Sequence, residues 1–166
     1  MKYTLKREQQ INSHISKVWA FFSSPHNLSV ITPPGMAFKV LGNISEAAIY
    51  EGMIINYKVS PLLGIPMNWQ TKIEKVIPEK QFTDTQQKGP YKYWHHYHQF
   101  ITNKNGVLMI DIVTYELPLG IIGKWMHQII VKKKLDKIFQ YRNQVIEQLF
   151  NSKKEQADSI HSNQNI

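Results

Sequence analysis

The sequence predicts an α+β fold: a seven-stranded antiparallel sheet, two short helices after the first strand and one long C-terminal helix. Residues 2–11 alternate as a strand does, and the segment from Phe38 to Pro118 divides into six short runs at Gly, Pro and Asn signals. Apolar residues after Pro118 recur at helical spacing. The connections between the six runs are too short for the crossovers that parallel strands need, so the strands are expected to be antiparallel.

The two short helices are expected directly after the first strand. In KVWAFFSS, Ser16 can cap the N-terminus of a helix and Pro25 ends it. HNLSVI predicts a second short helical turn, which the Pro33-Pro34 pair terminates.

The segment 120–150 predicts one long helix, or a short helix that leads into a long one. One side of it carries a stripe that should lie on the sheet; its residues are Leu135, Ile138, Phe139, Arg142, Val145, Ile146 and Leu149. A guanidinium within that stripe needs a partner, because an unpaired buried charge is very unfavourable. Arg142 can pair with Asp84 or Asp111, extend to the edge, or receive the carboxylate of a fatty-acid-like ligand.

Length and composition indicate one domain over residues 1–152, followed by a polar tail, 153–166, that is expected to be poorly ordered. A chain of 166 residues with 42% hydrophobic and 19% charged residues can bury a substantial core. The absence of cysteine excludes disulfides and thiolate catalysis. No apolar run is long enough for a membrane span and no secretory signal is present, so a cytoplasmic location is expected.

The net charge of +8 raises the question of an anionic partner. No nucleic-acid-reading motif accompanies the basic residues, so nucleic acid is not expected as a partner. A lysine-flanked apolar patch at the start of the long helix could make a weak membrane-surface or protein contact. It comprises Ile122, Met126, Ile129, Lys132, Lys133 and Lys134. The alternative is that the SPLLGIP loop or the Pro33-Pro34 segment covers this patch.

The stretch YKYWHHYHQF, residues 91–100, carries three histidines and five aromatic residues in a strand-like segment. Alternate residues of a strand point to opposite faces, so the two candidate faces are Trp94, His96, His98 and Phe100, or Tyr93, His95, Tyr97 and Gln99.

The following hairpin sets the register. A two- or four-residue loop centred on Lys104 and Asn105 places His98 opposite Asp111. The same register places His96 opposite Val113 and Trp94 opposite Tyr115. A three-residue loop with Gly106 in a bulge would reverse this parity.

Four segments carry a resemblance to a known superfamily: VWAFFSSPHNLSVITPPGM, YEGMIINYKVSPLLGIPMNWQTKI, DTQQKGPYKYWHHYHQF and VTYELPLG. They resemble the START and birch-pollen-allergen superfamily, also called SRPBCC or polyketide cyclase-like proteins, and in particular a bacterial ligand-binding branch. The resemblance covers about residues 3 to 152. It implies a helix-grip fold, in which a curved sheet wraps the terminal helix and the space between them binds lipids, steroids, polyketides or hormones.

The resemblance also favours the face with Trp94, His96 and His98 as the inner one. Asp84 and Gln86 are expected to share this interior. The expected function is the binding or carriage of a small hydrophobic ligand, without catalysis. The expected ligand-binding residues are Tyr57, Trp69, Thr71, Trp94, His96, His98, Tyr115 and Arg142.

The histidines allow three other interpretations. His98 and Asp111 could be the acid/base pair of a cyclase- or dehydratase-like enzyme, or could simply satisfy each other's hydrogen bonds within the sheet. A metal site of His96, His98 and Asp111 needs tighter convergence than strand spacing suggests, and no HExxH or Cys/His motif supports it. No metal and no cofactor are therefore expected, and the absence of P-loop and G-x-S-x-G motifs argues against nucleotide binding and hydrolysis.

Overall fold

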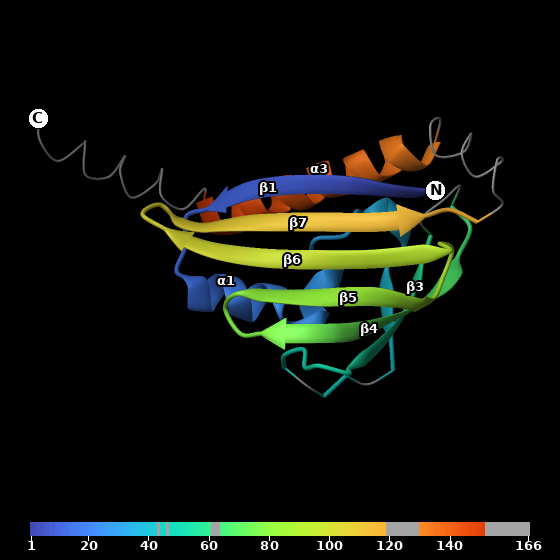
Figure 1. Cartoon of the computed structure of the whole chain (residues 1–166), viewed down its shortest axis with the longest axis horizontal. Helices are drawn as coiled ribbons and strands as arrows, with labels where there is room; N and C mark the ends of the chain where they lie inside the picture. Colours follow the sequence, from blue (N-terminus) through green and yellow to red (C-terminus); the bar gives the residue numbers. More distant parts are fainter. Residues whose placement is uncertain (43, 46, 61–63, 119–129, 152–166) are drawn as a thin grey trace, which may run out of the picture.

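The computed structural model describes residues 1–42, 44–45, 47–60, 64–118 and 130–151. It confirms the helix-grip fold: seven antiparallel strands form one sheet in the order β1-β7-β6-β5-β4-β3-β2. Helices α1 and α3 lie together behind this sheet in the view of Figure 1. The strands are β1 (Lys2–Ile11), β2 (Lys39–Leu41), β3 (Ile54–Val59), β4 (Met67–Ile77), β5 (Gln81–Lys88), β6 (Tyr93–Asn103) and β7 (Gly106–Glu116).

The two short helical segments after β1 are present, with one correction to the first. Helix α1 spans Ile15–Phe22, so it begins before the segment that the sequence predicted. Its cap is therefore His14 and not Ser16: the His14 side chain accepts a hydrogen bond from the backbone N–H of Ser16. The second segment, η1 (Pro25–Ser29), is a single 3₁₀ helix, and the short 3₁₀ turn η2 (Pro34–Met36) follows it.

The hairpin between β6 and β7 has the two-residue loop that the register argument required. Asn103 lies opposite Gly106, and His98 consequently lies opposite Asp111. Gly106 has a φ of +116°, and a Cβ at this position would lie 2.3 Å from the carbonyl oxygen of Ile11. Only glycine fits here, because the chain leaving β1 crosses the turn at this point.

The long helix α3 spans Lys132–Ile146 and continues into a π-helical turn, η4, at Glu147–Asn151. Leu135, Phe139 and Ile146 are buried, as the apolar stripe predicted. Leu149 was expected on the same face but is 40% exposed, and Phe150 is buried in its place. The wider π turn accounts for the difference, because it rotates the last residues relative to a regular α-helix.

Two hydrophobic clusters fill the space between the sheet and the helices. One surrounds α1 and the C-terminal end of α3, and the other lies at the N-terminal end of α3. Three buried ionisable side chains belong to neither cluster: His96, His98 and Asp111. They form a polar seam within the core.

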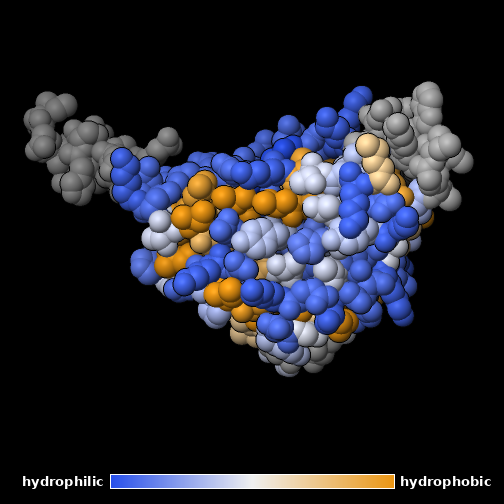
Figure 2. Space-filling view, viewed as in Figure 1, coloured by the Kyte–Doolittle hydropathy of each residue, from blue (hydrophilic) through white to orange (hydrophobic). Residues whose placement is uncertain are grey.

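The opposite face of the sheet is exposed to solvent. Figure 2 shows it as largely hydrophilic, with a strip of hydrophobic atoms along β7. In the described ranges no helix is both long and apolar enough to cross a membrane. The proposed contact residues Ile122, Met126 and Ile129 lie outside the described residues; Lys132 and Lys133, at the start of α3, are exposed.

The rotation at the π turn can be tested by comparing two aliphatic residues of the terminal helix. We expect Ile146→Ala to lower the free energy of unfolding by about 2–5 kcal/mol, because it opens a cavity beneath a side chain that is 1% exposed. The control Leu149→Ala should cost well under half as much. Urea denaturation followed by circular dichroism measures both, and equal losses would contradict the described end of the helix.

Candidate functional site

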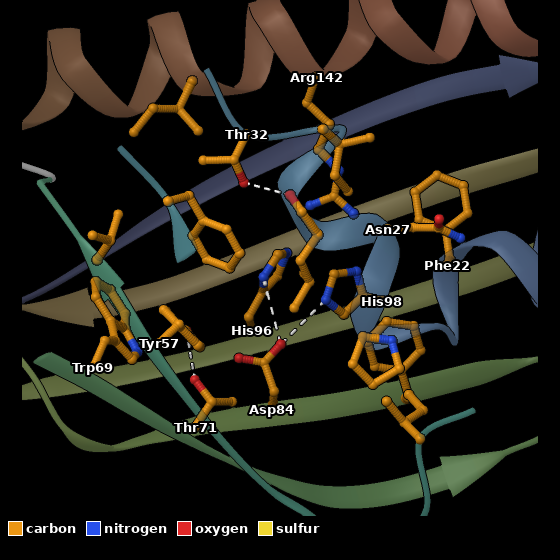
Figure 3. A pocket seen from close by; sticks show the side chains of 18 of the residues that line it. Phe22, Asn27, Thr32, Tyr57, Trp69, Thr71, Asp84, His96, His98 and Arg142 are labelled. Atoms are coloured by element: carbon orange, nitrogen blue, oxygen red, sulfur yellow. Dashed lines mark hydrogen bonds and ion pairs between the residues drawn. The ribbon is translucent and has the colours of Figure 1, made fainter. Parts of the chain in front are cut away.

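A cavity of about 190 Å³ lies between the sheet, α3 and the segment that contains α1, η1 and η2. Figure 3 shows its polar end, where Arg142 extends from the helix toward side chains that rise from the sheet. Most of the lining is apolar or aromatic, which is typical of pockets for small organic molecules.

Seven of the eight expected ligand-binding residues line this cavity. They are Tyr57, Trp69, Thr71, Trp94, His96, His98 and Arg142. Tyr115 does not line it: its ring packs on Tyr91 and Trp94, with centroid distances of 5.8 and 6.3 Å, and those two rings face the cavity instead. Tyr115 is thus on the inner face of the sheet, as the strand register predicted, but the rings of Tyr91 and Trp94 lie between it and the cavity.

An aromatic cluster centred on Trp69 forms one wall. The Trp69 ring stacks on Tyr57 at 5.9 Å and meets the edge of Trp94 at 5.3 Å. The Tyr57 hydroxyl lies 2.7 Å from the Thr71 hydroxyl, and burial raises the pKa of Tyr57 far above its ordinary value. Such interlocked rings make a stiff, apolar wall.

The polar end of the cavity contains two histidines between two aspartates. Asp84 of β5 approaches both rings: its Oδ2 lies 3.3 Å from Nε2 of His98 and 3.7 Å from Nδ1 of His96 (Figure 3). The other nitrogen of each ring faces Asp111 of β7. Asp111 Oδ1 lies 3.1 Å from Nε2 of His96 and 2.7 Å from Nδ1 of His98, the latter out of line for a hydrogen bond.

This arrangement shifts the pKa values of the two imidazole rings in opposite directions. Burial, aided by the neighbouring His98, lowers the pKa of His96 to about 4, so His96 is neutral near pH 7. Burial also opposes a charge on His98, but the Asp111 carboxylate outweighs it and raises the pKa of His98. For Asp111, burial is outweighed by Arg142 and His98, which hold its pKa well below the usual range.

Arg142 reaches this cluster from α3. Its ionic partner is Asp111 rather than Asp84, because Nη2 of Arg142 lies 3.7 Å from Asp111 Oδ1. This separation is too long for a hydrogen bond. The guanidinium carbon lies 5.4 Å from the ring of Phe22 and 5.8 Å from that of Phe139. Its Nε has no hydrogen-bond partner within the described part of the chain. Arg142 is therefore held by aromatic faces and keeps donors free for a further group.

Sequence reasoning placed Asp84 in the interior but did not include it among the ligand-binding residues. It also missed Phe82, whose ring stacks on His98 at 4.0 Å and lines the cavity. Both lie on the inner face of β5, where the register with β6 would have identified them. Asp111 lies in a smaller cavity of about 80 Å³ beneath α3, so His98 alone of the proposed acid/base pair faces the larger one.

Comparison with known proteins identifies the fold only. No known sequence family matches the chain, and no curated protein matches it. A protein from Chromobacterium violaceum is 12% identical, with a TM-score of 0.65 over 89% of this chain and 96% of its own. A protein from Thermus thermophilus is 14% identical, with a TM-score of 0.62 over 88% and 97% of the two chains.

A third similar structure is an enzyme. A point mutant of norcoclaurine synthase from Thalictrum flavum, in complex with a transition-state analogue, is 14% identical, with a TM-score of 0.61 over 89% of this chain and 96% of its own. These likenesses show that the chain shares its fold with these proteins.

The buried tyrosines predict a loss of stability in alkaline solution. Burial raises the pKa of Tyr91, so near pH 11 the folded state retains a proton that the unfolded state has released. The stabilisation is complete below about pH 10, and each further pH unit costs about 1.4 kcal/mol for such a group. We expect Tyr91→Phe to make the fall of the urea midpoint between pH 9.5 and 11 shallower.

The control for this measurement is Tyr50→Phe, which removes the hydroxyl of an exposed side chain. Equal slopes for wild type and Tyr91→Phe would contradict the buried position of the Tyr91 hydroxyl.

Proposed function

We propose that the protein binds a small, mainly apolar molecule that carries an acidic group, with the apolar part against the aromatic wall and the acidic group at Arg142. The observation that carries this proposal is the state of Arg142. It is a largely buried cation, with a side chain 12% exposed, that faces an apolar cavity, and its Asp111 contact is too long for a hydrogen bond.

The size of the cavity narrows the class of ligand. Its volume of about 190 Å³ is only slightly above the roughly 150 Å³ of a protein cavity that admits benzene. A single ring or a short chain fits this space, whereas a full-length lipid does not.

The donors near the cavity favour an anion over a neutral group. A guanidinium binds carboxylates through charge-assisted, often bidentate hydrogen bonds, and Nε of Arg142 has no partner among the described residues. The indole N–H of Trp69 is likewise buried without a partner in the described ranges. A ligand oxygen would satisfy donors that otherwise carry an energetic cost.

The second candidate is an enzyme of the cyclase or dehydratase kind, with His98 and Asp111 as its acid/base pair. His98 lines the cavity, lies 2.7 Å from Asp111 and has a raised pKa. A protonated imidazole in this position can donate a proton to a substrate oxygen. The similar fold of norcoclaurine synthase supports this candidate only by analogy.

Binding can be tested with named probes. We expect benzoate and hexanoate to quench the fluorescence of Trp69 and Trp94 saturably, and benzamide to bind more weakly. Arg142→Met should weaken binding of the carboxylates about 10- to 100-fold, because it removes one or two charge-assisted hydrogen bonds, and should change benzamide binding much less.

Arg7→Met is the matched control, because Arg7 pairs with Asp136 and does not line the larger cavity. The proposal fails if no carboxylate binds saturably, or if both arginine variants weaken binding equally.

The enzyme candidate makes a different prediction. Native mass spectrometry of gently purified protein identifies any bound molecule, and incubation with that molecule should yield a changed product only if the candidate is correct. His98→Gln should then abolish turnover while it leaves binding within about tenfold. Unchanged molecules after incubation with the wild type would exclude the enzyme candidate for that ligand.

A further inference from the structure

We propose that Asp84, His96 and His98 form a binding site for one divalent transition-metal ion, such as Zn²⁺ or Fe²⁺, at the polar end of the cavity. One ligand atom from each residue lies within 4.8 Å of the other two. The sequence predicted no metal here, because His96, His98 and Asp111 do not converge closely enough at strand spacing. In the structure it is Asp84, rather than Asp111, that lies close to both Nδ1 of His96 and Nε2 of His98 and completes the set of three ligands.

The two histidine rings have fewer hydrogen-bond donors than contacts with carboxylate oxygens. Both nitrogens of both rings face a carboxylate oxygen, which makes four contacts between 2.7 and 3.7 Å. A carboxylate only accepts, and a neutral imidazole donates from one nitrogen. Two neutral rings therefore supply two donors, which serve the hydrogen bonds from Nε2 of His96 to Asp111 and from Nε2 of His98 to Asp84. The Nδ1 atoms of His96 and His98 then present lone pairs to carboxylate oxygens 3.7 and 2.7 Å away. Protonating both rings would place two cations 3.8 Å apart beside Arg142, which like-charge repulsion opposes.

A metal ion solves this problem with both rings neutral. Nδ1 of His96 and Nε2 of His98 would offer their lone pairs to the metal together with the carboxylate of Asp84. The remaining nitrogens would then carry their hydrogens toward Asp111. The competing solution is a single proton on His98, which leaves Nδ1 of His96 at 3.7 Å from Asp84 without a hydrogen bond between them.

Asp111 has the position of an outer carboxylate. Histidines that bind metals almost always donate their other N–H to a carboxylate, a carbonyl or water, which fixes the tautomer and the ring orientation. Here one oxygen of Asp111 lies close to both rings on the side away from Asp84. Asp111 is in turn balanced by Arg142, 3.7 Å away.

The spacing and the donor types indicate which ions fit. Metal–ligand distances of about 2.0–2.2 Å in tetrahedral geometry place neighbouring ligand atoms about 3.3–3.6 Å apart. The two Asp84 contacts, at 3.3 and 3.7 Å, are close to this separation. Two imidazoles and one carboxylate suit zinc or ferrous iron better than magnesium or calcium, which prefer oxygen ligands.

The site would leave a coordination position open toward the cavity, since all three ligand residues line it and Asp111 does not. With neutral histidines, a divalent ion and Arg142 exceed the two carboxylates by one positive charge. An anionic oxygen of a ligand, or a hydroxide, would balance that charge. This inference goes beyond the proposed function, because the metal site does not depend on the identity of the organic ligand.

The experiment uses the full chain after chelator treatment and dialysis. We expect isothermal titration with Zn²⁺ to show one ion per chain with a micromolar or lower Kd, and Zn²⁺ to raise the Tm of the wild type. Co²⁺ should give the intense visible absorption of a low-symmetry, four- or five-coordinate site. Asp84→Asn and His96→Gln should each weaken Zn²⁺ binding at least tenfold.

Two variants sharpen the result. Asp111→Asn should weaken Zn²⁺ about 10- to 100-fold and retain the Co²⁺ spectrum, as expected for an outer carboxylate. His95→Gln is the matched control, because His95 is the neighbouring histidine on the outer face of β6; it should bind as the wild type does. Thermal unfolding in chelator identifies any variant that fails to fold, and the wild-type Tm shift needs no variant.

The proposal is overturned if the wild type binds neither Zn²⁺ nor Co²⁺ saturably, or if binding survives in Asp84→Asn and is lost in His95→Gln. Repeating the benzoate titration in chelator separates the two proposals. Carboxylate binding without metal binding leaves the proposed function standing alone, and metal binding without carboxylate binding does the reverse.

Discussion

The structure depends on the seam in which two histidines of β6 lie between an aspartate from each neighbouring strand. Four ionisable side chains in a protein core are costly unless each compensates another, and Arg142 from α3 is the fifth member of the set. In the seam, His98 stacks on Phe82 of one hydrophobic cluster and His96 meets the ring of Phe139 of the other, and here the cavity becomes polar. Its partners come from three adjacent strands and one helix, so the seam forms only when the whole fold has formed.

The aromatic wall and the polar seam offer a ligand two different kinds of contact. Trp69 and its neighbouring rings offer area without hydrogen-bond specificity, whereas Arg142, Asp84 and the histidines offer charge at one end. A pocket built this way selects by size at one end and by chemistry at the other. This arrangement is compatible with carriage, catalysis or metal-dependent binding, and the fold alone does not choose among them.

The sequence predicted most of the fold because its signals were local. Alternation marked the first strand and turn residues marked the other six, and the two-residue loop at Lys104 and Asn105 determined that His98 faces Asp111. The predictions that were wrong concern the end of the long helix and the start of α1, where a shift of one or two residues changes which side chain is buried or caps the helix. The π turn moved Leu149 off the sheet, and the earlier start of α1 made His14 its cap.

The site was only partly predictable for a different reason. Alternation along β6 identified which side chains face inward, but it could not show that Asp84 would lie between two rings, because this depends on side-chain rotamers across strands. Tyr115 shows the same limit. Strand parity gives the face of a residue and does not give its depth within the layer of side chains.

The pairing of the first strand with the last has a consequence for how the chain folds. Lys2 lies opposite Glu116 and Ile11 opposite Val107, so almost the whole sheet separates the partners along the sequence. Closing so long a loop is entropically costly, and contacts of high sequence separation slow folding. The chain after Ile11 also passes close over Gly106, so the pairing of β1 depends on the exact shape of the β6–β7 turn. Until β1 pairs with β7, one side of β7 is an open edge, with unpaired backbone groups that another strand could bind.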